Sequence, residues 1–86
     1  MKHAGPEALD RLEPLLASLR GLPSLREKSR GVFYLRSKAF LHFHEDATDV
    51  YADVRLAADA DFVRVRVSSK AEQARLRRAV ERACAG

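Results

Sequence analysis

The sequence predicts a small α+β protein: a four-stranded antiparallel β-meander flanked by an N-terminal and a C-terminal helix, with both helices on one face of the sheet. Three observations support this fold class. Apolar residues recur at helical spacing near each end of the chain, and four short segments rich in β-branched and aromatic residues lie between them. Because the links between these segments are short, consecutive strands should pair antiparallel in the order α-β-β-β-β-α, as one domain over residues 1–86.

The first helix is expected over residues 7–20. Its amphipathic stripe consists of leucines at positions 9, 12, 15, 16 and 19. Gly21 then provides a stop signal. Pro14 interrupts the pattern, because a proline inside a helix removes a backbone hydrogen bond. We expect either a kink or a new helix with Pro14 in its first turn. Residues 22–31 mix turn-forming and charged residues without a clear period, and are predicted to be a connector.

Strands are expected over residues 32–36, 39–44, 50–56 and 62–67, and the second helix over 70–84. Ser69 and Glu72 form a capping-box pattern at the start of this helix. Successive side chains of a strand point to opposite faces, so alternate residues of each strand should form the core. The predicted core residues of the sheet are Phe33, Leu35, Ala39, Leu41, Phe43, Val50, Ala52, Val54, Leu56, Val63, Val65 and Val67.

The register of the strands follows from matching these apolar faces. Pairing Phe43 with Val50, and Leu56 with Val63, satisfies that condition. The resulting pairs on the other face are His42–Tyr51, His44–Asp49, Asp53–Arg66 and Arg55–Arg64. This opposite face is the predicted binding face, which comprises Tyr34, Arg36, Phe40, His42, His44, Tyr51, Asp53, Arg55, Phe62, Arg64 and Arg66.

Charge and composition narrow the choice of partners. The 86 residues carry a net charge of +4, and basic residues cluster before position 39 and after position 62, with an acidic block between them. Alternating blocks of this kind suit pairing within the fold as well as binding of an anion. The single cysteine, Cys84, excludes an internal disulfide and a thiolate zinc cluster. No apolar run is long enough to cross a bilayer and the start lacks a signal-peptide pattern, so we expect a cytoplasmic protein without a membrane partner.

Two runs of residues carry a resemblance to known proteins. They are EKSRGVFY at 27–34 and AFLHFHED at 39–46, followed by ADVR at 52–55. With these runs the chain resembles a group of short uncharacterised bacterial proteins, over about residues 12 to 82. It is more distantly similar to the MmcQ/YjbR-like families, from Leu22-Pro23 through a charged connector to the hairpin. Those families imply an α+β fold with a sheet packed by helices, and no catalytic residue follows from either resemblance.

The preferred functional hypothesis is a non-enzymatic binding or protein-interaction module. Four aromatic residues on a sheet face that no helix covers would expose an apolar patch, which small proteins often bury by forming a homodimer. The alternative is binding of nucleic acid or another anion by Arg36, Arg55, Arg64 and Arg66 with stacking aromatics. No sequence motif of a nucleic-acid-binding family accompanies these arginines.

A metal site is a more remote alternative. His42 and His44 lie two residues apart on one side of a strand, and Asp49 or Asp53 of the next strand would complete the ligand set. Catalysis is an equally remote alternative, because the serines lie in turns, a helix or a cap without a nucleophile elbow, although His42 and Asp53 could exchange a proton. The sequence therefore predicts no catalytic residue and no cofactor.

Overall fold

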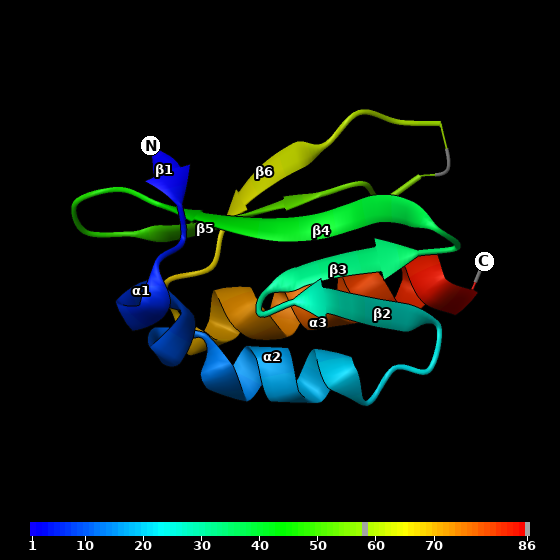
Figure 1. The fold of residues 1–86 in the computed structure, drawn as a ribbon, viewed down its shortest axis with the longest axis horizontal. Helices are drawn as coiled ribbons and strands as arrows, with labels where there is room; N and C mark the ends of the chain where they lie inside the picture. Colours follow the sequence, from blue (N-terminus) through cyan, green and yellow to red (C-terminus); the bar gives the residue numbers. More distant parts are fainter. Residues whose placement is uncertain (58, 86) are drawn as a thin grey trace.

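The computed structural model describes residues 1–57 and 59–85 and has the predicted α+β architecture (Figure 1). The strands are β1 (Lys2–His3), β2 (Leu25–Ser29), β3 (Val32–Leu35), β4 (Lys38–Glu45), β5 (Val50–Val54) and β6 (Val63–Arg66). The helices are α1 (Pro6–Arg11), α2 (Glu13–Arg20) and α3 (Lys70–Ala85). Ala58, in the predicted link 57–61, and Gly86, at the end of the predicted domain, lie outside the described residues.

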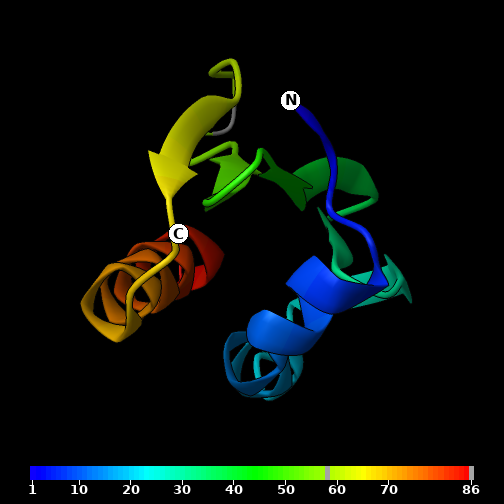
Figure 2. The ribbon, with the colours of Figure 1, turned by 90° about the vertical axis from the view of Figure 1, so that its left-hand side faces the viewer.

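The six strands form one antiparallel sheet in the order β2-β3-β4-β5-β6, and β1 pairs with β4. The predicted count of four strands is therefore too low. All three helices lie on one side of the curved sheet, and on the other side β1 and β6 rise along the flanks of β4 and β5 (Figure 2). The core lies between the helices and the sheet, where Leu16 of α2 and Val80 of α3 are buried with Leu41 and Val54 of the sheet.

The N-terminal segment contains two helices rather than the single helix expected over residues 7–20. α1 ends at Arg11, and Leu12 starts α2 in a turn conformation. Pro14 falls in the first turn of α2, where a backbone N–H would have no helical partner. The second of the two predicted outcomes at Pro14, a new helix start, is therefore confirmed.

The predicted connector at residues 22–31 contains the edge strand β2. Leu25 and Glu27 are half-buried while Arg26 and Lys28 are exposed, so the segment has the period of a strand. The half-buried position 27 is a carboxylate that accepts hydrogen bonds from Arg20 Nε at 2.5 Å and from the backbone N–H of Gly31 at 2.9 Å. A charged residue at this position conceals the apolar alternation in the sequence.

A β-bulge in β4 reverses the predicted exposure of one aromatic residue. Phe33 pairs with Leu41, but the next residue, Tyr34, pairs with Ala39, so Phe40 is an extra residue in β4. Consequently Phe40 and Leu41, although consecutive, are both buried, with 3% and 0% of their surface exposed. The prediction that Phe40 lies on the exposed face is wrong, and Ala39, predicted as core, pairs with Tyr34 and is only half-buried.

The observed register differs from the predicted one by two residues. Phe43 pairs with Ala52 rather than with Val50, and Val54 rather than Leu56 pairs with Val63. A shift of two residues leaves every side chain on its predicted face but changes its neighbours. The observed pairs of the outer face are His42–Asp53, His44–Tyr51, Asp53–Arg64 and Tyr51–Arg66. The predicted pair of like charges, Arg55 opposite Arg64, is absent from the ladder that the described residues form.

The ends of the sheet and α3 complete the fold. Leu56 and Val63, predicted as core, are 42% and 45% exposed, because Leu56 follows the end of β5 and Val63 begins the edge strand β6.

The capping box is confirmed, since the N–H of Glu72 donates to Ser69 Oγ at 3.1 Å and the N–H of Ser69 donates to Glu72 Oε1 at 2.9 Å. Among the described residues, no helix has both the length and the apolar character that a membrane span requires.

Candidate metal centre

All three histidines of the chain gather at one place on the outer face of the sheet. The ring centroids of His42 and His44, two residues apart on β4, are 5.0 Å apart. His3 lies directly opposite His44 in the pairing of β1 with β4, and their rings stack at 4.6 Å. The His3 ring is 5.9 Å from that of His42. Three imidazoles from two segments of the chain thus form a single cluster.

Backbone contacts hold the N-terminal segment against β4. The N–H of Ala4 donates to the carbonyl of Phe43 at 3.0 Å, and the N–H of Gly5 donates to Glu45 Oε2 at 2.6 Å. These bonds extend the short ladder of β1 to the start of α1. The position of His3 therefore follows from the fold, although its side chain is exposed.

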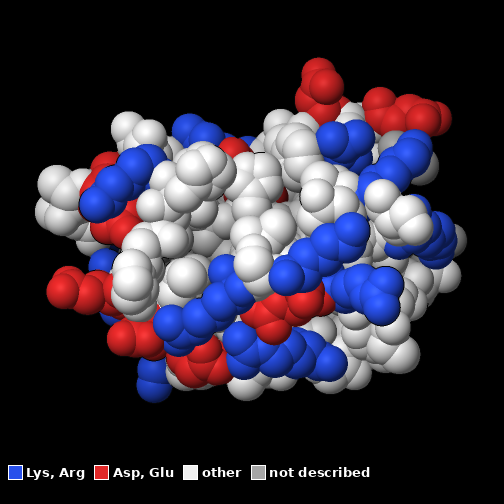
Figure 3. Space-filling view, viewed as in Figure 1, with Lys and Arg blue, Asp and Glu red and all other residues white. Residues whose placement is uncertain are grey.

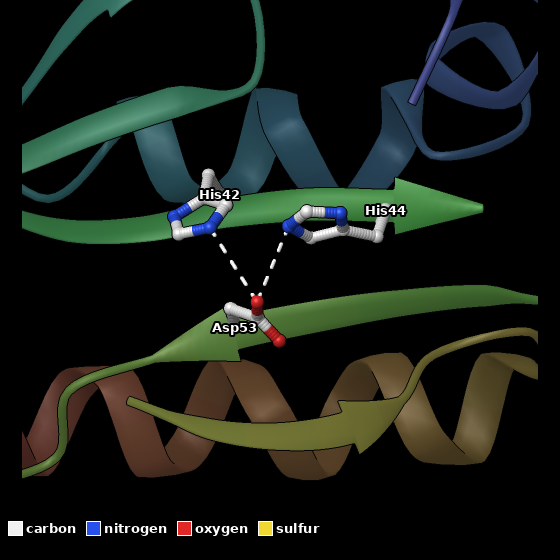
Figure 4. Close-up of side chains that lie close together, drawn as sticks. All are labelled: His42, His44 and Asp53. Atoms are coloured by element: carbon white, nitrogen blue, oxygen red, sulfur yellow. Dashed lines mark ion pairs between the residues drawn. The ribbon is translucent and has the colours of Figure 1, made fainter. Parts of the chain in front are cut away.

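Asp53 of β5 places a carboxylate beside two of these imidazoles (Figure 4). Its Oδ2 atom lies 3.5 Å from His42 Nε2 and 3.2 Å from His44 Nε2. Asp53 is only 8% exposed, which is unusual for a carboxylate. Arg64 of β6 compensates its charge with two hydrogen bonds, from Nε to Oδ1 at 2.7 Å and from Nη2 to Oδ2 at 2.8 Å.

His44 carries two buried ring nitrogens, neither of which has a hydrogen-bond partner among the described residues. Its Nε2 atom lies 3.2 Å from Asp53 Oδ2, but the two groups do not form a hydrogen bond. Leaving one buried polar group unpaired costs about 1–3 kcal/mol. Such groups are rare in folded proteins and are often explained by a bound ion or water or by a functional role. The two unpaired nitrogens of His44 are therefore the strongest indication of a ligand site at this cluster.

The protonation states of the cluster are those of metal ligands. Burial lowers the pKa of His42 and of His44, and the opposing effect of Asp53 offsets this only in part, so both imidazoles are neutral at pH 7. The hydrogen bonds from Arg64 lower the pKa of Asp53, so its carboxyl group is ionised. Metal binding requires both a neutral imidazole and a charged carboxylate.

The spacing of the donor atoms fits one ion. One donor nitrogen or oxygen each from His42, His44 and Asp53 lie within 4.8 Å of one another. Two ligand atoms at the usual ~2.0–2.2 Å from a tetrahedral zinc ion lie roughly 3.3–3.5 Å apart. The two distances to Asp53 Oδ2, at 3.2 and 3.5 Å, match that spacing. Small movements of the two rings would complete a three-ligand set.

Asp49, the carboxylate that the predicted register places near the histidines, lies elsewhere. Its Oδ1 accepts hydrogen bonds from Arg66 Nη2 at 2.8 Å and from Ser68 Oγ at 2.9 Å. Because the register is shifted by two residues, Asp53 takes the place beside His42 that the predicted pairing gave to Tyr51. Of the two carboxylates predicted as alternatives, Asp53 lies beside the histidine pair and Asp49 does not.

The remaining residues of the predicted binding face divide into several local groups. The Lys28 ammonium lies 4.2 Å from the Tyr34 ring, and the Tyr51 hydroxyl donates to Asp46 Oδ2 at 3.2 Å. Phe62 lies edge-on to His42, with ring centroids 5.1 Å apart, and the Arg55 guanidinium lies 4.5 Å from the centroid of the Phe62 ring. The rest of this face comprises Arg66, paired with Asp49 and Glu72, and Arg36 in the β3–β4 turn.

Sequence reasoning misses His3 altogether. β1 has only two residues, too few for a strand period, and nothing in the sequence near position 3 indicates pairing with β4. The sequence offers one signal for His3, which is that the chain has only three histidines. This count does not show that His3 lies beside His44.

No family model, curated protein or solved structure matches this chain. The resemblance to short bacterial proteins therefore stays a prediction.

Proposed function

We propose that this protein binds a divalent transition-metal ion through His42, His44 and Asp53. The observation that carries the proposal is the convergence of His42 and His44 on one buried carboxylate, Asp53, with the ring of His3 stacked on that of His44. His3 is the natural fourth donor, because its ring stacks on that of His44 and its exposed side chain is free to turn. The unpartnered nitrogens of His44 supply the independent support.

The donor set selects the class of metal. Two or three imidazole nitrogens and one carboxylate oxygen suit Zn²⁺, Ni²⁺ or Cu²⁺. Mg²⁺ and Ca²⁺ prefer six or more oxygen ligands, and this cluster offers a single carboxylate that also accepts two bonds from Arg64. Arg64 acts as the outer partner that fixes the orientation of the ligating carboxylate, while lone pairs of Oδ2 stay directed toward the histidines.

The other two functional hypotheses draw less support from the side chains. Phe40 lies in the core, which reduces the aromatic patch invoked for self-association. Arg64 and Arg66, two of the four arginines proposed for nucleic-acid binding, each pair with at least one carboxylate. Both hypotheses stay proposals, which sedimentation at two salt concentrations with and without an oligonucleotide would separate.

The test is a titration of the full chain, first treated with a chelator, with Zn²⁺, Ni²⁺ and Mg²⁺. We expect one Zn²⁺ or Ni²⁺ per chain by calorimetry, with large shifts of the His42 and His44 ring resonances, and no response to Mg²⁺. The variant His44→Ala removes one metal-ligating side chain and should weaken Zn²⁺ binding by at least about tenfold. Asp49→Asn is the matched control, since it removes an acid of the same face that lies outside the cluster.

Two outcomes would contradict the proposal. Imidazole resonances that do not move on addition of Zn²⁺ would exclude the cluster as a ligand set. Equal weakening by His44→Ala and Asp49→Asn would mean that the ion binds to the acidic surface in general. The role of His3 has a separate readout, because His3→Ala should weaken binding less than His44→Ala does.

A further inference from the structure

A hollow of about 350 Å³ opens at one end of the sheet. None of the residues that line it belongs to the proposed metal site. It lies between the β3–β4 turn, the segment that follows β5 and the last turns of α3. Apolar groups form much of its wall, contributed by Leu35, Phe40, Leu56 and Ala83. The charged residues that line it are all basic: Arg36, Lys38, Arg55 and Arg82. Figure 3 shows basic side chains gathered at the end of the molecule where Figure 1 places the β3–β4 turn and the end of α3.

Among the described residues, five arginines outside the hollow are compensated by a carboxylate. Arg20, Arg30, Arg64, Arg66 and Arg77 each pair with a carboxylate at 3.0 Å or less. Within the described part of the chain, none of the four cations at the hollow forms such a pair. The Nε atom of Arg55 is buried and has no hydrogen-bond partner there either.

Four uncompensated positive charges around an apolar wall are complementary to one kind of ligand. A free inorganic anion would leave the apolar wall in contact with water. A neutral apolar ligand would leave the cations without a partner. A nucleic acid would need exposed aromatic rings for stacking, and the aromatic residue here, Phe40, is only 3% exposed. A volume of about 350 Å³ lies in the range of pockets that hold small organic molecules.

We infer that this hollow binds a free carboxylate with an aliphatic chain, with the chain against Leu35, Leu56 and Ala83 and the carboxylate among Arg36, Lys38 and Arg82. Hydrogen bonds between a carboxylate and a guanidinium or ammonium group are stronger than those between neutral groups. Burial of the chain against the apolar wall removes apolar surface from water, which stabilises the complex. The inference is independent of the metal proposal, since the two sites share no residue.

The test uses decanoate and its neutral counterpart decanol on the full chain. Decanoate should shift the methyl resonances of Leu56 and Ala83, and decanol should bind at least about tenfold more weakly. The double variant Lys38→Ala/Arg82→Ala should also weaken decanoate binding at least about tenfold. Arg11→Ala/Lys70→Ala removes the same net charge at exposed positions outside the hollow, and should leave the affinity unchanged.

Several outcomes would overturn the inference. Equal affinity for decanol would show that the cations contribute nothing. Equal weakening by the two double variants would show that only the overall charge matters. Binding to vesicles of anionic phospholipid without any response to free decanoate would assign this end of the molecule to a membrane surface. Thermal unfolding of each variant, followed by circular dichroism, confirms that the compared proteins are folded.

Discussion

The imidazole cluster and the cationic hollow differ in how their charges are compensated. Around Asp53 the carboxylate charge is matched by Arg64 through two hydrogen bonds, and the neighbouring histidines are neutral. At the hollow, Arg82 and Lys38 have no acidic neighbour among its described lining residues. A carboxylate that a neighbouring arginine compensates keeps a fixed orientation, whereas uncompensated cations attract an anion. The overall charge of +4 hides this difference.

Each region also has its own phenylalanine, and the two are placed differently. Phe62 is half-buried on the outer face, between His42 and the guanidinium of Arg55. Phe40 is buried at the hollow, because the bulge in β4 turns it toward the helices. Both residues belong to the face that the sequence predicts to be exposed. The bulge in β4 thus buries Phe40, whereas Phe62, which precedes β6, stays on the outer face.

The largest expected effect comes from exchanging these rings for alanine. Phe40→Ala should lower the free energy of unfolding by at least about 3 kcal/mol, because it removes a buried ring and leaves a cavity. Phe62→Ala should lower it by less than half as much, since this ring is only partly buried. Urea unfolding followed by circular dichroism measures both values. Equal losses for the two variants would contradict the difference in burial.

Much of the fold is predictable because residue patterns determine it locally. Alternating valines place β5 and β6 on the correct faces, and Ser69 with Glu72 marks the start of α3. The register is not local, because a shift of two residues preserves the apolar face while changing every cross-strand neighbour. β2 is concealed because Glu27 occupies its half-buried position and is satisfied by Arg20, a residue outside the strand.

The candidate site is less predictable than the fold for the same reason. The spacing of His42 and His44 in one strand indicates a shared face from the sequence alone. The identity of their carboxylate depends on the register of β4 with β5, which the sequence leaves open between Asp49 and Asp53. His3 depends on a contact between positions 3 and 44, for which a two-residue strand carries no pattern. Long-range pairing therefore assembles the site from locally ambiguous segments.

A smaller effect should follow when Asp53 loses its compensating charge. Arg64→Ala should raise the pKa of Asp53, because the hydrogen bonds from Arg64 are the main cause of its lowered value. The lowered pKa of Asp53 stabilises the native state at pH values above the unfolded pKa of the carboxyl group, and this contribution is lost as the pH falls through the folded pKa. Arg64→Ala should therefore also destabilise the protein at neutral pH. A carboxyl ¹³C NMR titration measures the pKa, and urea unfolding measures the stability.

The matched control for Arg64→Ala is Arg82→Ala, which removes an arginine from the uncompensated region. It should leave the pKa of Asp53 unchanged and should change the stability by no more than about 0.5 kcal/mol, as is usual for a surface substitution. An unchanged pKa of Asp53 in Arg64→Ala would contradict the compensation of this carboxylate by Arg64.

The smallest expected effect is a pH dependence that arises from the two half-buried histidines, His42 and His44. Burial lowers the pKa of His42 and of His44 below the ordinary histidine value of about 6.5, so the unfolded chain binds more protons than the native protein as the pH falls below this value. Stability is therefore fully present above about pH 6.5 and declines as the pH falls toward the folded pKa values. The charged and titratable groups that face these imidazoles are Asp53, Arg64 and His3.

The measurement compares urea unfolding at about pH 8 and about pH 5 with a chelator present, which removes any contribution of metal binding. The wild-type protein should lose more stability between these pH values than His42→Gln/His44→Gln, because the glutamines do not titrate. The ionised Asp53 favours the protonated imidazoles and so opposes the effect of burial on their pKa values. The difference in stability loss between the wild-type protein and the variant should therefore be small. A wild-type protein that becomes more stable at the lower pH would mean that the carboxylate outweighs burial and that the histidines are charged in the native cluster.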